Sequence, residues 1–364
     1  MHKPTSVAKY LKNLSISKVE EKKLKEVSEL LQKSSIIITG GKGRSGFAAQ
    51  IGARMLKTSR TNAFFYSDVG LPLDKDLAKN KTTAILISSS GTTEEMIRLA
   101  EELKELGAKI VCFTSYINSP LAKLSDINMY LPQRAQSEKG TYFERQVVTT
   151  EEPTMGDLPE ERSLFLQYLL AKDIRGLKLL PAKEIEDFRK WMMENIDDIV
   201  ELKNWLKIYW NSGILIVSRG TSNSVSGMIA NRASHYHMNC RLATSPTSAP
   251  LDHHELALIV SGSADKAYAS LVQKIREKMR TKLGKKEVSP AVVAITGKGA
   301  KWVRECDANL VLGGADPDGR MLHTEKSPQS FYFRAPIVLN MILRSIATEK
   351  GLTKKFAELR HINL

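Results

Sequence analysis

Two strand-turn-helix patterns, both within residues 36–95, constrain the fold of this chain more than any other feature of its sequence. IIITGGKGRSG (36–46) and AILISSSGTTEE (84–95) each begin with an apolar, β-branched run of strand length and end in small residues that lead into a helical pattern. Such alternation is typical of right-handed βαβ units, so the sequence predicts a parallel sheet flanked by helices. Further strand patterns lie at 62–66, 109–113 and 127–131.

Both turns have the composition of an anion-binding site. Glycine lets the backbone come close to a ligand, while Ser and Thr hydroxyls and the N–H groups of a helix start supply donors where the helix dipole favours negative charge. The second turn carries five hydroxyl residues, whereas an ordinary N-cap needs only one. The predicted phosphate-binding residues are Gly43, Arg44, Ser45, Ser88, Ser89, Ser90, Thr92 and Thr93, with Arg44 or Lys42 as the charge partner.

The first turn does not fit the common nucleotide-binding motifs. GGKGRSG matches neither GxxxxGK[ST] nor GxGxxG, and no acidic residue follows at the distance that a dinucleotide fold requires. A single Gly-rich turn is common in any α/β protein, so the hydroxyl-rich second turn carries most of the weight. The sequence therefore favours a small phosphorylated ligand over ATP or NAD.

Three segments together resemble the sugar isomerase (SIS) domain. The GRSG turn, the SSSGTTEE loop and AKIVCFTSYINSPLAKLSDINMYLP (108–132) are most similar to 6-phospho-3-hexuloisomerases, over about residues 36–175. The resemblance implies a hexose phosphate isomerase, ketose or aldose-ketose, that works through an enediol without a metal or other cofactor. The alternatives are a phosphoglucose/phosphomannose isomerase, an aminosugar-phosphate deaminase, or a non-catalytic phosphosugar-binding or regulatory SIS protein.

The same resemblance indicates candidate catalytic residues. The family's base falls on Glu160 in MGDLPEERSLFL (155–166), with Glu161 as the alternative, and two family histidines fall on His235 and His361. Acidic residues after a proline are also ordinary first-turn helix residues, and an isolated histidine is more often structural than catalytic. A glutamate in one half of the chain and two histidines in the other favour an acid-base couple shared between domains.

The sequence also repeats itself. ILIVSRGTSNSVSGMIANRAS (214–234) matches IIITGGKGRSGFAAQIGARML (36–56) at a constant offset, and LALIVSGSAD (256–265) matches AILISSSGTT. Two tandem SIS domains are therefore expected, each a parallel five-stranded sheet flanked by helices in a flavodoxin-like three-layer sandwich.

The predicted first domain spans 1–180 and has complete phosphate loops. The predicted second domain spans 181–364, is degenerate, and is preceded by a long linker helix over 182–209. Its helix start in SPQSFYFRAPIVLNMIL has Tyr332 near the glutamate position and no carboxylate, so this half is expected to be catalytically incomplete.

The net charge of +14 at pH 7 raises the question of nucleic acid. Lys and Arg mostly alternate with Glu and Asp in helical patterns such as 19–33 and 274–287, of which only the second is a dense basic run. No helix-turn-helix, aromatic ribonucleoprotein or zinc-finger signature accompanies it, so no nucleic-acid partner is expected. A positive field would also attract a phosphosugar.

The remaining composition indicates a reduced, soluble, cytoplasmic protein. The chain has three scattered cysteines and no run of 18 apolar residues, so neither disulfides nor a membrane span is expected. HYH (235–237) and HH (253–254) are too local for a convincing zinc site. We expect a homodimer or a pseudodimeric monomer, because a tandem repeat can imitate a dimer.

Overall fold

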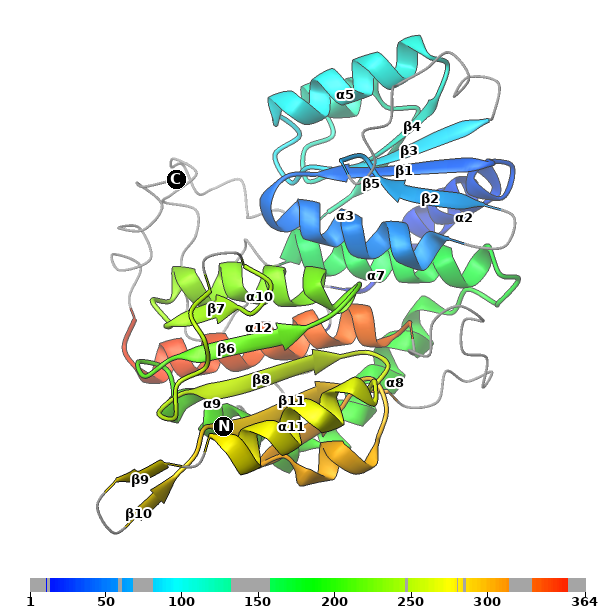
Figure 1. The fold of residues 1–364 in the computed structure, drawn as a ribbon. Coiled ribbons are helices and arrows are strands. Elements are labelled where there is room, and N and C mark those ends of the chain that lie inside the picture. Colours follow the sequence, from blue (N-terminus) through cyan, green and yellow to red (C-terminus); the bar gives the residue numbers. More distant parts are fainter. Residues whose placement is uncertain are drawn as a thin grey trace. The chain divides into compact units, whose positions relative to one another are not determined.

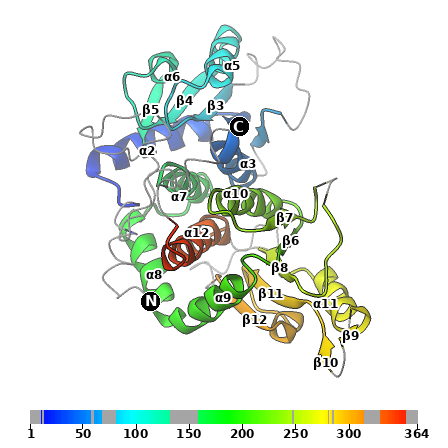
Figure 2. The same ribbon diagram turned by 90° about the vertical axis from the view of Figure 1, so that its left-hand side faces the viewer.

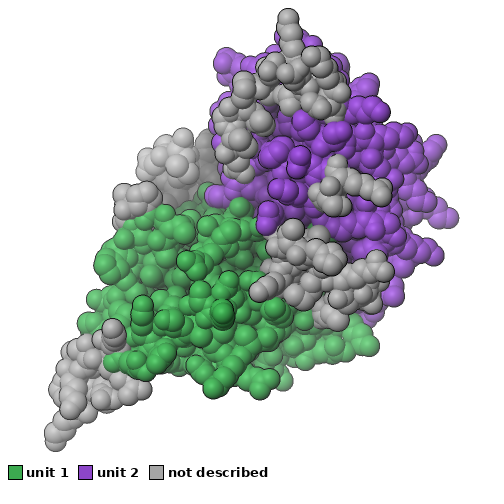
Figure 3. Space-filling view, turned by 45° about the vertical axis from the view of Figure 1, so that its right-hand side comes forward, with its two compact units in different colours: residues 1, 190–364 green, residues 2–189 purple. Residues whose placement is uncertain are grey.

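The chain forms two compact units. The computed structural model describes residues 11, 14–57, 61–67, 81–131, 158–245, 248–279, 281–283, 286–313 and 329–352. His2–Arg189 form the N-terminal unit, purple in Figure 3, and Lys190–Leu364 form the C-terminal unit, green in Figure 3. The division falls inside a helix, whereas the sequence analysis placed the domain boundary at 180–181, just before that helix.

The N-terminal unit is built on a five-stranded parallel sheet (Figure 1). Its order is β2-β1-β3-β4-β5, so the direction of winding reverses between β1 and β3. The central strands are buried almost throughout, as expected of a parallel sheet covered on both faces. The strands are β1 (Ile36–Gly41), β2 (Asn62–Phe65), β3 (Thr82–Ile87), β4 (Lys109–Thr114) and β5 (Ile127–Tyr130).

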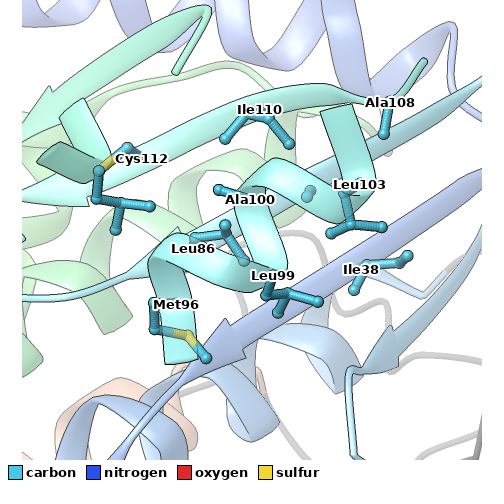
Figure 4. Packing of buried hydrophobic residues seen from close by; sticks show 11 residues of the cluster. Ile38, Leu86, Met96, Leu99, Ala100, Leu103, Ala108, Ile110 and Cys112 are labelled. Carbon is cyan, nitrogen blue, oxygen red and sulfur yellow. The ribbon is translucent and has the colours of Figure 1, made fainter. Parts of the chain in front are cut away.

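Helices cover both faces of this sheet (Figures 1 and 2). On one face, α5 (Glu94–Glu105) buries Met96, Leu99, Ala100 and Leu103 against side chains of β1, β3 and β4 (Figure 4). On the other face lie α2 (Lys18–Gln32) and α3 (Gly43–Leu56), and both pack on α7 (Leu158–Asp173). The short helix α6 (Pro120–Leu124) joins β4 to β5. The predicted three-layer sandwich is thereby confirmed in this unit.

A capping box fixes the start of α2 and also anchors α7. The backbone N–H of Ser17 donates to Glu20 Oε2 at 2.8 Å, and the Glu20 N–H donates to Ser17 Oγ at 3.3 Å. The other oxygen of Glu20 pairs with the guanidinium of Arg162, which also donates to the Ser15 carbonyl at 2.7 Å. Because Arg162 is the fifth residue of α7, this contact holds the N-terminal end of that helix.

The C-terminal unit repeats the same connectivity. Its parallel sheet has the order β7-β6-β8-β11-β12, which is again the winding 2-1-3-4-5. A cluster that includes Val272, Ile275, Trp302 and Val303 packs on one sheet face. The strands are β6 (Ile214–Ser218), β7 (Cys240–Leu242), β8 (Leu256–Ser261), β11 (Ala291–Thr296) and β12 (Ala308–Val311). The helices are α10 (Ser222–His235), α11 (Ala267–Lys278), η1 (Lys301–Glu305) and α12 (Phe331–Glu349).

Two sequence predictions in this half are wrong. The long helix expected over 182–209 is two helices, α8 (Pro181–Glu194) and α9 (Ile196–Ile208), which break at Asn195. The side-chain amide of Asn195 donates to the Trp191 carbonyl at 2.8 Å, and such local bonds compete with helix continuation. The helical pattern over 274–287 ends with α11 and gives way to an antiparallel hairpin, β9 (Thr281–Leu283) and β10 (Lys286–Val288).

No helix among the described residues combines the length and the apolar character that crossing a lipid bilayer requires.

Candidate functional site

The turns after β1 and β3 lie side by side in the N-terminal unit. Gly41 at the end of β1 pairs in register with Ile87 at the end of β3, so residues 42–45 and 88–93 leave the same sheet edge. This edge is where the strand order reverses, and open α/β sheets bind their ligands there. The fold therefore brings together the two turns that the sequence analysis selected.

The turn after β1 needs glycine because its backbone packs closely. A Cβ atom on Gly41 would lie 2.5 Å from the carbonyl oxygen of Ser45, and Gly43 adopts a φ of 54°. Helix α3 begins directly at Gly43, and its first turn contains no acidic residue and no side-chain cap. The first turn of α3 thus supplies no anion of its own to the positive end of the helix dipole.

The second turn is a network of hydroxyl groups. Ser88 Oγ lies 3.0 Å from Thr93 Oγ1 and accepts the Gly91 N–H at 3.1 Å, while Ser90 Oγ accepts from the Thr92 N–H and hydroxyl at 3.2 and 2.9 Å. Gly91 has a φ of 65°. Thr93 is the N-cap residue of α5 but makes no side-chain cap bond. Hydroxyls and helix N–H groups are therefore available for an anion.

Residues after the neighbouring strand β4 support this turn, and the sequence analysis missed them. Thr114 Oγ1 and the Ser115 N–H donate to the Ser89 carbonyl at 3.2 and 3.0 Å, and the Ser89 and Ser115 hydroxyls lie 3.4 Å apart. The available signal was the Thr-Ser pair that ends KIVCFTS, because parallel neighbouring strands bring their carboxyl ends to one edge.

Glu160 meets the first turn from α7. Ser45 Oγ donates to Glu160 Oε1 at 3.4 Å, and Arg44 Nη2 lies 3.9 Å from Glu160 Oε2. The Glu160 and Arg44 side chains are each 9% exposed. Burial raises the pKa of Glu160, against the opposing effects of the Arg44 charge, the Glu160 backbone N–H and the Ser45 hydroxyl. A buried carboxyl with a raised pKa in such a position is a candidate proton acceptor.

The alternative base, Glu161, is fully buried. The contacts to Arg44 and Ser45 given above belong to Glu160, which lies one position nearer the start of α7. Geometry therefore favours Glu160 of the two.

The two candidate histidines are not brought to this site within the N-terminal unit. His235 is buried at the C-terminal end of α10, and α10 belongs to the C-terminal unit. The 14 residues of α10 place His235 about 20 Å of helix away from that unit's own turn after β6. His361 lies outside the described residues.

The C-terminal unit keeps the turns but not the carboxylate. Gly220, after β6, has a φ of 57°, and Ala264, after β8, has a φ of 47°, close to the values of Gly43 and Gly91. The first turn of α12 contains no acidic residue; Tyr332 there is buried, and Arg334 donates to the Leu312 carbonyl at 3.3 Å. This half thus lacks a counterpart of Glu160 at the helix start, as the sequence predicts.

The cysteines do not offer an activated nucleophile. Burial raises the pKa of each of the Cys112, Cys240 and Cys306 thiols to about 12. All three are free thiols. Within the described ranges, no group of three or more His, Cys, Asp or Glu residues is arranged to hold a metal ion.

Comparison with known proteins places these features in a family. The SIS domain model matches residues 29–149. The chain is 30% identical over 142 residues to an uncharacterized protein of Aeropyrum pernix, covering 38% of this chain and 65% of that one. It is 28% identical over 131 residues to the 3-hexulose-6-phosphate isomerase of Mycobacterium gastri, covering 36% of this chain and 63% of that one. The chain therefore matches less than two thirds of the length of either relative.

Solved structures show the same fold. The tagatose-6-phosphate ketose/aldose isomerase of Escherichia coli aligns with 97% of this chain and 92% of its own, with a TM-score of 0.61 and 14% identity. That alignment extends over both repeats, and the family match covers both turns of the candidate site. Residues 29–149 therefore carry a SIS domain, and the whole chain shares the fold of this isomerase.

Proposed function

We propose that the protein is a phosphosugar isomerase of the type that interconverts 3-hexulose 6-phosphate and fructose 6-phosphate. The observation that carries this proposal is the buried Glu160 carboxylate, which contacts Ser45 and Arg44 at the sheet edge beside the hydroxyl-rich turn. The similarity to the 3-hexulose-6-phosphate isomerase of Mycobacterium gastri supports the choice of substrate.

In the proposed reaction, Glu160 removes the proton from the carbon next to the substrate carbonyl. The C–H electron pair forms the carbon-carbon double bond of an enediol as the carbonyl oxygen takes up a proton. The enediol then gives its other hydroxyl proton to the group that protonated the carbonyl oxygen. The electron pair of the C=C bond forms a new C–H bond at the former carbonyl carbon with the proton that Glu160 returns. A raised pKa suits this task, because a general base works best when its pKa lies near the working pH.

The proton on the carbonyl oxygen needs a donor. We assign this role to a histidine imidazole, with His235 and His361 as the candidates that the sequence offers. A positioned acid and a positioned base each contribute on the order of 10²- to 10⁴-fold in rate. This pair does the chemistry without a metal.

Deuterium exchange tests this proposal. The purified full chain is incubated with fructose 6-phosphate in deuterated water, and substrate deuteration and 3-hexulose formation are followed by NMR. The wild type should incorporate deuterium, and Glu160→Gln should reduce turnover by at least about 10²-fold. Glu161→Gln is the matched control and should retain most of the activity. Equal turnover in Glu160→Gln and wild type would disprove the mechanism.

A phosphosugar-binding regulatory protein is the second candidate. The C-terminal unit supports it, because its turns are retained while its helix start lacks a carboxylate. Saturable binding of a phosphosugar with no deuterium exchange in the wild type would favour this candidate over an enzyme.

A further inference from the structure

Two cations in the first turn contact different elements of the N-terminal unit. Arg44 Nη2 lies 3.9 Å from Glu160 Oε2 on α7, whereas Lys42 Nζ lies 3.4 Å from Glu95 Oε1 in the first turn of α5. Lys42 is extended, with φ −120° and ψ 153°, and the left-handed Gly43 separates it from Arg44. The backbone therefore directs the two side chains to opposite sides of the turn.

The two ion pairs also differ in exposure. Arg44 and Glu160 side chains are each 9% exposed, but Lys42 and Glu95 are 48% and 58% exposed. An exposed pair contributes little and is easily exchanged for another partner, whereas breaking a buried pair leaves an uncompensated charge. An incoming anion can thus displace Glu95 from Lys42 far more readily than Glu160 from Arg44.

Lys42 also lies beside the turn after β3, which supplies hydrogen-bond donors. Its partner Glu95 is the second residue of α5, two positions after the N-cap residue Thr93, whose hydroxyl lies 3.0 Å from that of Ser88. The phenol of Tyr66 and the carboxylate of Glu95 raise the pKa of Lys42, so the amine is a cation at any physiological pH. Glu94 and Glu95 are both acidic residues of the first turn of α5, and Glu95 is the one that pairs with Lys42 while Glu94 pairs with Arg98.

We propose that Lys42, and not Arg44, is the cation that binds the ligand's phosphate, in competition with Glu95, while Arg44 is a positioning residue that holds Glu160. The role given to Arg44 rests on the proposed function, whereas the phosphate-binding role given to Lys42 does not. It orients the substrate: the phosphate lies at the exposed end with α5, and the carbonyl end lies at the buried end with α7.

Phosphate binding separates the two cations. The affinity of the full-length chain for inorganic phosphate is measured by isothermal titration calorimetry at low salt. Lys42→Met should weaken binding about tenfold, because it removes a charge-assisted hydrogen bond, and Glu95→Gln should strengthen it about two- to fivefold by freeing the amine. Arg44→Met should leave the affinity within about twofold.

The opposite signs of Lys42→Met and Glu95→Gln make this test specific, since damage to the fold would weaken binding in both. Loss of phosphate affinity in Arg44→Met equal to that in Lys42→Met would overturn the inference, and so would weaker binding in Glu95→Gln. These titrations need no turnover, so they judge the phosphate assignment even if the chain is not an isomerase.

The pH profile of kcat/KM tests the role of Arg44. Removing the positive charge beside Glu160 should move the acidic limb of the profile to higher pH in Arg44→Met, while Arg44→Lys should keep the limb near its wild-type position. Lys42→Met should raise KM and leave the limb in place. A limb that moves in Lys42→Met but not in Arg44→Met would reverse the two roles.

Discussion

A Cβ atom on Gly52 of α3 would lie 1.5 Å from Oε1 of Gln167 on α7. The Gln167 amide cannot turn aside without loss, because its Nε2 donates to the Ala48 and Ser163 carbonyls at 3.1 and 3.2 Å. This contact sets the distance between the helices that carry Ser45 and Glu160, so Gly52 is a structural requirement of the candidate site.

Gly52→Ala should therefore destabilise the protein. The better helix propensity of alanine gains up to about 1 kcal/mol, but displacing a buried, hydrogen-bonded amide costs more, and we expect a net loss of about 1–2 kcal/mol. Calorimetry should show a melting temperature about 2–8 °C lower. Gly299→Ala, with no atom within 4 Å of the new Cβ, is the control and should melt like the wild type. An unchanged melting temperature in Gly52→Ala would contradict this account of the packing.

Glu160→Gln should stabilise the protein at neutral pH while it removes activity. Because burial raises the folded-state pKa of Glu160 above 4.5, the folded state binds this proton more tightly than the unfolded state. The stability contributed by this group is present below pH 4.5 and is lost as the pH rises through the folded-state pKa. We expect a gain in the free energy of unfolding at about pH 7.5 that disappears near pH 4.

Glu349→Gln should have the opposite pH dependence. Its carboxylate binds the ammonium groups of Lys203 and Lys207 on α9, which lower the pKa of Glu349 to about 2. This stability is present above pH 4.5 and is lost as the pH falls through about 2. The side chain is 36% exposed, so the expected loss at neutral pH is under about 1 kcal/mol. Urea unfolding at several pH values would measure it, and a loss that persisted at pH 2 would refute the assignment.

Ala264→Gly should stabilise the C-terminal unit. An alanine at φ 47° is strained by about 1–2 kcal/mol, and glycine removes this strain. The greater freedom of glycine in the unfolded chain offsets part of that stabilisation, so the expected net gain in stability is about 0.5–1 kcal/mol. The reverse change at the counterpart, Gly91→Ala, should destabilise the second turn, because its Cβ would lie 2.0 Å from Ser119 Oγ. Thermal melting of both variants, with opposite shifts, checks the pair.

The sequence predicted the parallel strands well for a physical reason. Runs such as IIIT and AILI are rich in apolar and β-branched residues, as is typical of buried parallel strands, and they end where hydroxyl and glycine residues begin. The same endings located the two turns of the site. The strand winding 2-1-3-4-5 then brought these turns to one edge in each unit.

Contacts between residues far apart in the chain could not be predicted from the sequence. Nothing in the local pattern around Lys42 and Arg44 tells which carboxylate each cation meets, because Glu95 and Glu160 come from separate helices. The break at Asn195 depends on one side-chain bond to Trp191 within an otherwise periodic stretch. Thr114 and Ser115 gain their importance only from the neighbouring strand that ends beside them.

The ion pair between Glu20 and Arg162 has a consequence for how activity can vary among related proteins. Glu20 caps the start of α2 and, through Arg162, also holds the end of α7 that carries Glu160, the general base of the proposed reaction. We therefore expect natural variation at Glu20 or Ser17 to affect the proposed reaction through the position of α7, and sequence surveys that follow only the two turns would overlook it.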